Sequence, residues 1–369
     1  MANLFNNLST VFRSGSSAVM HGFGWDADTP AEADTRGDRT GVAVLDERAS
    51  NSAVANPSAS NTAMSSTAAM PRTAEHDDDL LRNHQRDARL LHEELRGLRG
   101  DGKPVIHPLA AVHENACIGE GTVIGPFCVI GPDVVIGRNN KLTNNVTIVG
   151  RTVVGDHNLF HPNCVIGSEP QDKKYRGEPT RTEIGDYNCL REAVTIHAGT
   201  IQGGSVTSIG DYNLLMVNAH FGHDVRWGSH SIVANNCMIA GHVHSGDGVA
   251  LMGGVGVHHF TTIGDYSYIA AYAQISKDVP PFVKVDDEGS VRGLNGVGLL
   301  RHGHSTDDIE ALGEMVRRLW IRRDRAPFAE VRRELERSAT NPCVRQVLAF
   351  LRRRDQGVNG RYREGLRAD

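Results

Sequence analysis

The chain has 369 residues, of which 40 are glycine and only 5% are aromatic, and its formal net charge is −5. This mild negative charge gives no general nucleic-acid signature, and no apolar run approaches the roughly 20 residues of a membrane-spanning helix. Residues 1–13 lack the basic start and apolar stretch of a secretory signal. The six cysteines are scattered without a CxxC pair, so we expect buried thiols in a reducing, cytoplasmic setting, with neither disulfides nor zinc sites.

Residues 1–103 read as a low-complexity extension. Residues 49–73 are almost all Ser, Ala, Asn, Thr, Met and Pro. Such a composition cannot bury enough apolar surface to offset the entropy of ordering the chain. Leucines among charged residues predict one helix near 77–99. We expect this extension to be a tether without chemistry.

From residue 104 an apolar side chain recurs at every sixth position. The first run is Ile106, Val112, Ile118, Ile124, Ile130, Ile136, Leu142, Ile148, Val154, Phe160 and Ile166. The count resumes at Ile184 and again at Ile209, and it reaches Ile275 with Ser245 as the single polar departure in that last run. A period of six fits neither a helix nor an ordinary strand and indicates a stacked solenoid. Glycine often follows the apolar residue, where we expect it to permit the tight corner.

Three hexapeptide units close one triangular coil, so residues 104–303 predict a parallel β-helix of about nine coils. The count breaks at residues 168–182 and 199–208. Repeats tolerate insertions only as external loops, and such loops often carry function.

Residues 304–369 predict a helical region. Ser305 can cap a helix that has Asp307 and Asp308 in its first turn. Asn341-Pro342 reads as a second cap followed by proline at the first helical position. From His304 onward there are fifteen Arg, no Lys and eleven acidic residues. This basic excess is either a solvated face or a docking surface for an acidic partner.

Histidines are concentrated in the second half of the β-helix. They are His197, His220, His223, His242, His244, His258 and His259. Because successive coils are about eighteen residues apart, we expect a column of imidazoles along one edge. A column could bind zinc, as in the γ-class carbonic anhydrases of this fold. It could instead supply a general base for acyl transfer, with Asp224 orienting His223. The spacing slightly favours acyl transfer.

Several segments resemble the UDP-N-acetylglucosamine acyltransferases. They are the loop Ser168–Arg181 with its Gln-Asp-x-Lys-Tyr core, Arg191–Thr200, Asn213–Asp224 with its His-x-x-His-Asp end, Ala240–Val243 and Asp278–Phe282. The resemblance extends over residues 105–351. It implies a left-handed helix, a homotrimer, and transfer of an (R)-3-hydroxyacyl chain from acyl carrier protein to the 3-hydroxyl of UDP-N-acetylglucosamine. That reaction is the first step of lipid A biosynthesis and needs no cofactor or metal.

The same resemblance implies roles for particular residues. His223 would be the general base, Asp224 would orient it, and the Gly241 N–H would stabilise the thioester oxyanion. The implied substrate-binding residues are Gln171, Asp172, Lys174, His197, His220, His242, His258, His259, Asn295 and Arg301. The Gln171 loop is expected to face His223 across a subunit boundary. Ala271 stands where the family's acyl-chain ruler has glycine, so its methyl group should favour a shorter chain.

Three positions depart from the family pattern. His259 replaces a glutamine, Val297 a glutamate and His302 a second arginine at the nucleotide end. Histidine replaces an arginine's bidentate phosphate binding only when protonated, so the acceptor is a variant UDP-sugar or binds more weakly. Other readings stay open, namely a zinc enzyme of the γ-carbonic anhydrase type, a paralogue without turnover, and the related N-acyltransferase of an amino sugar.

Overall fold

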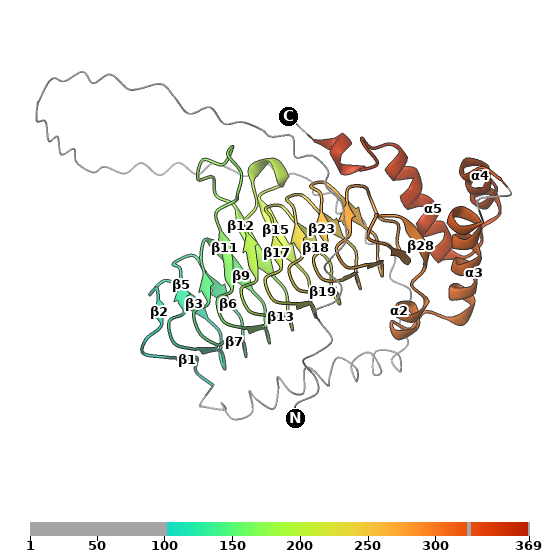
Figure 1. The fold of residues 1–369 in the computed structure, drawn as a ribbon. Helices are drawn as coiled ribbons and strands as arrows, with labels where there is room; N and C mark the ends of the chain where they lie inside the picture. The colour runs from blue at the N-terminus through green and yellow to red at the C-terminus, as the bar shows by residue number, and fades with distance from the viewer. Residues whose placement is uncertain (1–101, 323–325, 368–369) are drawn as a thin grey trace, which may run out of the picture. The chain divides into compact units, whose positions relative to one another are not determined.

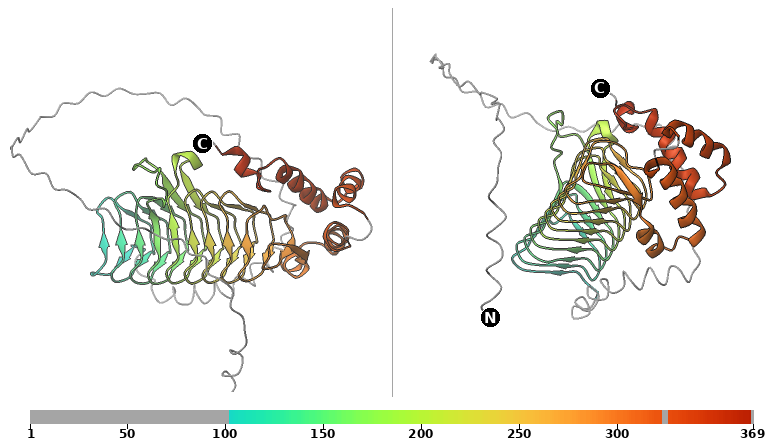
Figure 2. Two further views of the ribbon diagram at one scale, coloured as in Figure 1. Left: turned by 45° about the horizontal axis from the view of Figure 1, so that its top comes forward. Right: turned by 45° about the vertical axis from the view of Figure 1, so that its right-hand side comes forward.

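The computed structural model describes residues 102–322 and 326–367, and the predicted extension with its 77–99 helix lies almost entirely outside them. Within these residues, none of the helices combines the length and apolar character needed to cross a membrane. The strands stack into a three-sided prism whose coils run in chain order along its axis, with helices following the last coil (Figures 1 and 2).

Three sheets form the sides of the prism. Sheet A has the order β1 (Val105–Ile106), β4 (Val123–Ile124), β7 (Lys141–Leu142), β10 (Leu159–Phe160), β13 (Cys189–Leu190), β16 (Leu214–Leu215), β19 (Ile232–Val233), β22 (Ala250–Leu251), β25 (Tyr268–Ile269), β27 (Val283–Val285) and β28 (Val291–Leu294). Sheet B has the order β2 (Ala111–Val112), β5 (Val129–Ile130), β8 (Thr147–Ile148), β11 (Val165–Ser168), β14 (Thr195–His197), β17 (His220–Phe221), β20 (Met238–Ile239), β23 (Gly256–Val257) and β26 (Gln274–Ile275). Sheet C has the order β24 (Thr262–Ile263), β21 (His244–Ser245), β18 (Arg226–Trp227), β15 (Val206–Ile209), β12 (Arg181–Ile184), β9 (Arg151–Val154), β6 (Val135–Ile136) and β3 (Cys117–Ile118).

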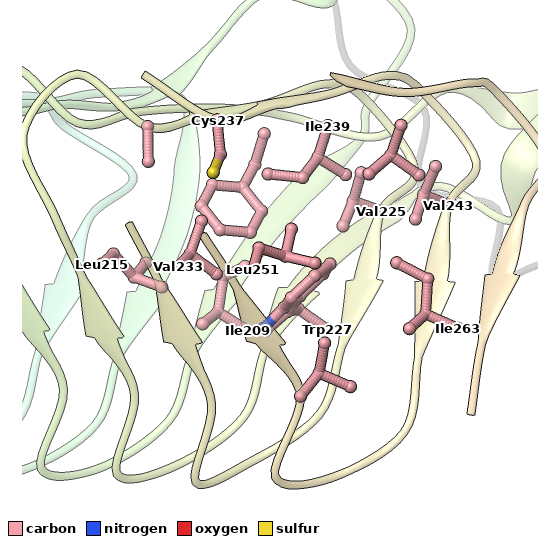
Figure 3. Close-up of a cluster of buried hydrophobic side chains, with 14 of the residues drawn as sticks. Ile209, Leu215, Val225, Trp227, Val233, Cys237, Ile239, Val243, Leu251 and Ile263 are labelled. Carbon is pink, nitrogen blue, oxygen red and sulfur yellow. The ribbon is translucent and has the colours of Figure 1, made fainter. Parts of the chain in front are cut away.

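The six-residue period places one apolar residue of each unit inside the prism. Parallel pairing brings Ile118 opposite Ile136 and Ile130 opposite Ile148, eighteen residues on. The same alignment continues through the later coils, where the inward side chains form one buried cluster (Figure 3). The predicted parallel β-helix is therefore confirmed. Cys117 is exposed, against expectation, because it occupies the outward position beside Ile118.

The glycines that follow the inward residues are mostly not the residues that form the tight corners, contrary to the sequence prediction. The residue in the left-handed region is mostly the third after the inward residue, as at Asn145 (φ 53°) and His242 (φ 62°). A glycine directly after the inward residue is needed for lack of space, because a Cβ on Gly119 would lie 2.4 Å from the carbonyl oxygen of Gly137. Close stacking of successive coils thus selects glycine at such positions, whereas Gly167 has a left-handed φ of 79° and Gly131 has room for a Cβ.

Both breaks in the period are loops at the corner where the chain passes from sheet B to sheet C, which we call the BC corner. The first loop joins β11 to β12, and the second joins β14 to β15 through the short 3-10 helix η1 (Ile201–Gly203). The chain passes from sheet C to sheet A at the CA corner and from sheet A to sheet B at the AB corner.

The parallel coils end where β27 pairs antiparallel with β28. The helices that follow are α2 (Gly296–Arg301), α3 (Thr306–Val316), the π-helical turn η2 (Arg317–Ile321), α4 (Phe328–Ser338), α5 (Pro342–Asp355) and the 3-10 helix η3 (Arg363–Leu366). Ser305 accepts a hydrogen bond from the Asp308 N–H, and Asn341 caps α5, so both predicted caps are confirmed. Helix α2 begins before His304, because Asn295 caps it directly after β28.

Candidate active site

Asp224 is the most constrained carboxylate of the BC corner. It has a φ of 61°, and its side chain is inaccessible to solvent between β17 and β18. The carboxylate accepts hydrogen bonds from Thr200 N–H (2.7 Å), Thr200 Oγ1 (2.6 Å) and His223 Nδ1 (2.8 Å). Three donors from the η1 loop and the corner thus fix the orientation of Asp224, and Asp224 in turn fixes the His223 ring.

His223 presents its second nitrogen to solvent-accessible space. When Nδ1 carries the proton donated to Asp224, Nε2 is left as the basic atom. The ring lies against Gly241, where an added Cβ would come within 2.7 Å of Nε2. Gly241 is therefore required for this packing, and its own N–H makes no hydrogen bond among the described residues.

His242 lies in register with Asp224 of the preceding coil, and its ring also meets the His223 ring edge to face, with centroids 4.9 Å apart. Asp224, His242 and Phe260 occupy the same left-handed corner position in three successive coils. The rings of His242 and Phe260 are parallel, with centroids 4.3 Å apart. Burial lowers the pKa of His242 to about 4, and the nearby Asp224 only partly opposes this effect. The expected column thus exists, with an offset of one residue between His223 and His242.

The other histidines do not all join this column. His220 lies on β17, where its Nδ1 is 2.8 Å from Thr195 Oγ1, and burial followed by the neighbouring His197 lowers its pKa. His197 Nδ1 contacts the carbonyl oxygen of Glu169 at 2.6 Å. His244 lies on β21 in sheet C, where burial lowers its pKa to about 2. The prediction of a single column is therefore wrong for His197 and His220, which lie on β14 and β17 of sheet B, and for His244, which lies on β21 of sheet C.

A groove of about 560 Å³ runs along sheet B beside the corner. It is lined by Gln171, His220, Gly222, His223, Met238, Ile239, Ala240, Gly241, Gly256, Val257, His258, Gln274, Ile275 and Ser276. Five residues that the sequence selects, from Gln171 to His258, thus share one groove. Gln171 lines it from the same chain as His223, so their proximity does not require the subunit boundary that we expected.

The remainder of the first loop is organised by its own hydrogen bonds. Asp172 Oδ1 accepts from the Lys174 N–H at 2.9 Å, and the Tyr175 hydroxyl donates to the Glu178 carbonyl at 3.0 Å. The Lys174 side chain is exposed, and Asp172 is half-buried. Neither side chain lines the groove in this structure.

Three selected residues lie away from the groove. Asn295 caps α2 and donates through Nδ2 to the Tyr266 carbonyl oxygen at 2.9 Å, which places it at the CA corner. Arg301 is exposed in the last turn of α2, and Ala271 is exposed at the AB corner. One chain therefore does not bring these residues to His223.

Three residues of the site, Thr200, Gln274 and Ser276, were not predicted from the sequence. Thr200, which donates twice to Asp224, stands 24 residues from it across an inserted loop. Gln274 and Ser276 occupy the groove's far end. Their only signal is their place in the coil that follows His258, one repeat along the prism.

Two groups of side chains among the described residues have metal-ligand chemistry. The first is His223, Asp224 and His242, but Asp224 Oδ2 already accepts from Thr200 Oγ1 and His223 Nδ1.

The second group is His304, Asp308 and Cys343. The Asp308 carboxylate accepts hydrogen bonds from the side chains of Ser305 and Asn341. It lies at the N-termini of α3 and α5, where the helix dipoles favour anions. A cation at either site would have to displace existing donors.

Comparison with known proteins gives the same picture as the geometry. A family model described as "Udp N-acetylglucosamine O-acyltransferase; Domain 2" matches residues 278–359. An acyl-(acyl carrier protein)–UDP-N-acetylglucosamine O-acyltransferase of Synechocystis is 40% identical over 218 residues, covering 58% of this chain and 78% of the relative.

Solved structures agree with this relationship. The UDP-N-acetylglucosamine acyltransferase of Francisella novicida superposes with a TM-score of 0.64 and 36% identity, covering 67% of this chain and 91% of that structure. The Arabidopsis enzyme of the same name gives a TM-score of 0.59 and 32% identity, covering 68% of this chain and 96% of that structure.

A left-handed parallel β-helix with an aspartate-oriented histidine beside an apolar groove defines an acyltransferase of the hexapeptide-repeat class. Within that class, the identity and coverage leave no ambiguity about the relationship. The chain belongs to the UDP-N-acetylglucosamine O-acyltransferase family.

Proposed function

We propose that the protein transfers an (R)-3-hydroxyacyl chain from acyl carrier protein to the 3-hydroxyl of UDP-N-acetylglucosamine, the first step of lipid A biosynthesis. The observation that carries this proposal is the His223–Asp224 pair packed against Gly241 at the edge of the groove. A cytoplasmic location is part of the proposal, because charged nucleotide sugars do not cross membranes unaided.

His223 acts as the general base. Its Nε2 accepts the proton of the sugar hydroxyl while the hydroxyl oxygen bonds to the thioester carbonyl carbon. Asp224 stabilises the imidazolium that forms, because its carboxylate lies 2.8 Å from Nδ1. When the tetrahedral intermediate collapses, the carbon–sulfur bond breaks and His223 returns the proton to the departing thiolate of the carrier.

The Gly241 N–H stabilises the oxyanion of that intermediate. This donor is not engaged by another described residue, and it lies beside His223. A fixed donor aimed at developing negative charge lowers the barrier without reorganisation at the moment of reaction. The apolar groove residues Met238, Val257 and Ile275 provide a surface for the acyl chain, and Ala271 stays the proposed limit of chain length.

The acceptor is held from two directions. His220, His242, His258 and His259, with Asp172 and Lys174 of the first loop, are the proposed ligands of the sugar and donor. We propose a homotrimer, in which Asn295 and Arg301 at the CA corner of one subunit complete the site of its neighbour. The separation of these residues from His223 within one chain supports this arrangement.

A direct assay tests the function. Purified protein should acylate UDP-N-acetylglucosamine from a hydroxyacyl carrier protein, and His223→Ala should lower kcat by about 10²- to 10⁴-fold. Turnover of substrate by the His223→Ala variant at the normal rate would contradict the assignment. If a chelator abolished activity and zinc restored it, the carbonic-anhydrase type of chemistry would gain the support that the His223, Asp224 and His242 cluster alone does not give.

A further inference from the structure

The last eight described residues, Gly360–Arg367, form a segment that we call the C-terminal strap. It begins within a two-residue turn, in which Asn359 and Gly360 have φ of 53° and 75° while Val358 and Arg361 exchange backbone hydrogen bonds of 3.0 and 2.9 Å. Positive φ at both central residues is what this tight turn requires. Figure 2 shows α5 and the strap running back along the prism toward the edge that carries the two loops. The match to the family model ends at residue 359, directly before the strap.

The strap is docked on the last coil by buried polar contacts. The Asp278 N–H donates to the Gly360 carbonyl at 2.9 Å, and Asp278 Oδ2 accepts from the Tyr362 N–H at 2.8 Å. Arg361 is 6% exposed and donates to the Ser276 carbonyl oxygen at 2.6 Å. Since Ser276 also lines the groove, the strap is anchored at the groove's own margin.

Beyond this anchor the strap contacts the histidines of the BC corner. Arg363 Nε donates to the carbonyl oxygen of His242 at 3.4 Å. The Glu364 carboxylate is largely buried, accepts from the Arg361 guanidinium at 3.3 Å and lies 3.7 Å from His259 Nε2. Two consecutive strap residues thus contact two proposed acceptor ligands on successive coils.

A third contact supports the same face from outside. The Arg367 guanidinium lies 5.7 Å from the centre of the Phe260 ring, and Phe260 stacks on His242. The strap consequently contacts His242 in two ways. Arg363 binds the His242 backbone carbonyl, and Arg367 packs on Phe260, which stacks on the His242 imidazole.

Arg363 is a poor choice for anchoring alone. Burial, followed by the proximity of Arg226, lowers the pKa of Arg363 to about 10, so the group remains charged at neutral pH in an unfavourable place. A long hydrogen bond does little to offset the desolvation of a cation. Fold stability therefore does not explain the buried charge of Arg363, whereas a role at the site does, because Arg363 lies beside His242 and Asp224.

We propose that the strap forms one wall of the acceptor pocket, and that Arg363 and Glu364 are positioning residues that hold His242 and His259 against the acceptor sugar. This inference rests on the proposed function. It also bears on one departure from the family pattern, because the imidazole at position 259 lies 3.7 Å from the strap glutamate and, when protonated, adds a charge that the usual glutamine lacks.

A double-mutant cycle tests the pairing. Glu364→Ala should raise KM for UDP-N-acetylglucosamine about fivefold, the scale of coupling between residues in contact, with kcat nearly unchanged. In a His259→Gln background the same substitution should add almost nothing to KM. Equal effects of Glu364→Ala in both backgrounds, or no effect in either, would overturn the pairing. Glu310→Ala, which removes an exposed carboxylate from α3, is the matched control.

A readout without turnover separates this inference from the proposed function. In full-length protein the strap should slow modification of His242 and His259 by diethyl pyrocarbonate, followed by mass spectrometry of the peptides. Truncation after Asn359 and the variant Arg363→Ala should both speed modification of His242, and Arg363→Lys should restore part of the protection. Unchanged rates of His242 modification in these variants would refute the proposal that the strap is a wall of the pocket, even if the enzyme is active. Faster rates in a protein that does not acylate UDP-N-acetylglucosamine would refute only the proposed substrate.

Discussion

Asp224 at the BC corner and Asp186 at the CA corner use their carboxylates in different ways. At the CA corner Asp186 accepts a hydrogen bond from the Asp156 N–H at 2.7 Å, and the Asp186 N–H donates to Asp211 at 2.7 Å. These carboxylates tie each coil to the next. At the BC corner the Asp224 carboxylate instead accepts from the side chains of His223 and Thr200, as well as from the Thr200 N–H.

The contrast shows how one backbone serves both structure and chemistry. Both corners place a left-handed residue at the same point of the repeat, as at Tyr187 (φ 56°) and Asp224 (φ 61°). At the CA corner these positions carry stacked rings, such as Tyr187 on Tyr212 at 4.8 Å. At the BC corner they carry Asp224, His242 and Phe260, of which the last two also stack. A ladder of backbone donors stabilises the prism, whereas side-chain donors orient a base.

After loss of His223 or its partner Asp224, the largest effect is expected from the glycine beside the base. Gly241→Ala places a Cβ within 2.7 Å of the His223 ring and should displace the base, lowering kcat about 100-fold, as removal of a transition-state contact does. Gly253→Ala is the control, since its Cβ would meet no atom closer than 3.6 Å. Steady-state kinetics of both variants make the test, and similar kcat values for the two would show that the His223–Gly241 contact is not needed.

A smaller effect is expected at Thr200. Thr200→Val removes the hydroxyl that donates to Asp224 at 2.6 Å but keeps the shape of the side chain and the backbone donor. Loss of one buried hydrogen bond to a charged group should cost about 1.5–3 kcal/mol in transition-state stabilisation, or roughly tenfold or more in kcat/KM. Measured kcat/KM within twofold of the parent would mean that Asp224 is held without this loop.

The smallest effect concerns stability and pH. The folded-state pKa values of His242 and His244, about 4 and about 2, lie below the ordinary value of 6.5. The unfolded chain therefore binds protons at these residues that the folded chain does not, and stability falls as pH drops below 6.5. Each histidine contributes up to about 1.4 kcal/mol per pH unit over that range.

Denaturant unfolding at pH 6.5 and pH 5 measures this slope. His244→Val should flatten it, because the variant has no imidazole to protonate in the unfolded chain. Asp265 and Asp278 oppose the trend, since burial raises their pKa values in the folded chain and makes protonation favour the folded state. An identical slope in parent and variant would show that His244 is accessible to protons in the folded protein.

The sequence predicts the prism well because its repeat is a direct consequence of packing. One inward residue in every six, two insertions and two helix caps are all local signals, and each has a counterpart in the structure. The seven histidines are harder to place, because a side chain one residue away from the corner points along a different face. His197, His220 and His244 lie on strands and not at the corner itself.

Contacts across the insertions are not predictable from the period. The Thr200–Asp224 bonds span a loop that breaks the count of eighteen, and the Arg363–His242 contact joins residues 121 positions apart. The sequence also did not predict that the Asn295 amide caps α2 and binds the Tyr266 carbonyl oxygen. These contacts depend on how separate elements dock, which no local pattern records.

The comparison of the two corners is tested most directly by one matched pair of variants in the acyl-transfer assay. Asp224→Asn should lower kcat by about 10²- to 10⁴-fold, because the amide cannot hold the His223 tautomer or its imidazolium. Asp186→Asn should leave kcat close to that of the parent while lowering the free energy of unfolding by about 1 kcal/mol. Full activity of Asp224→Asn, or equal losses of kcat in both variants, would contradict the assignment of chemistry to the BC corner.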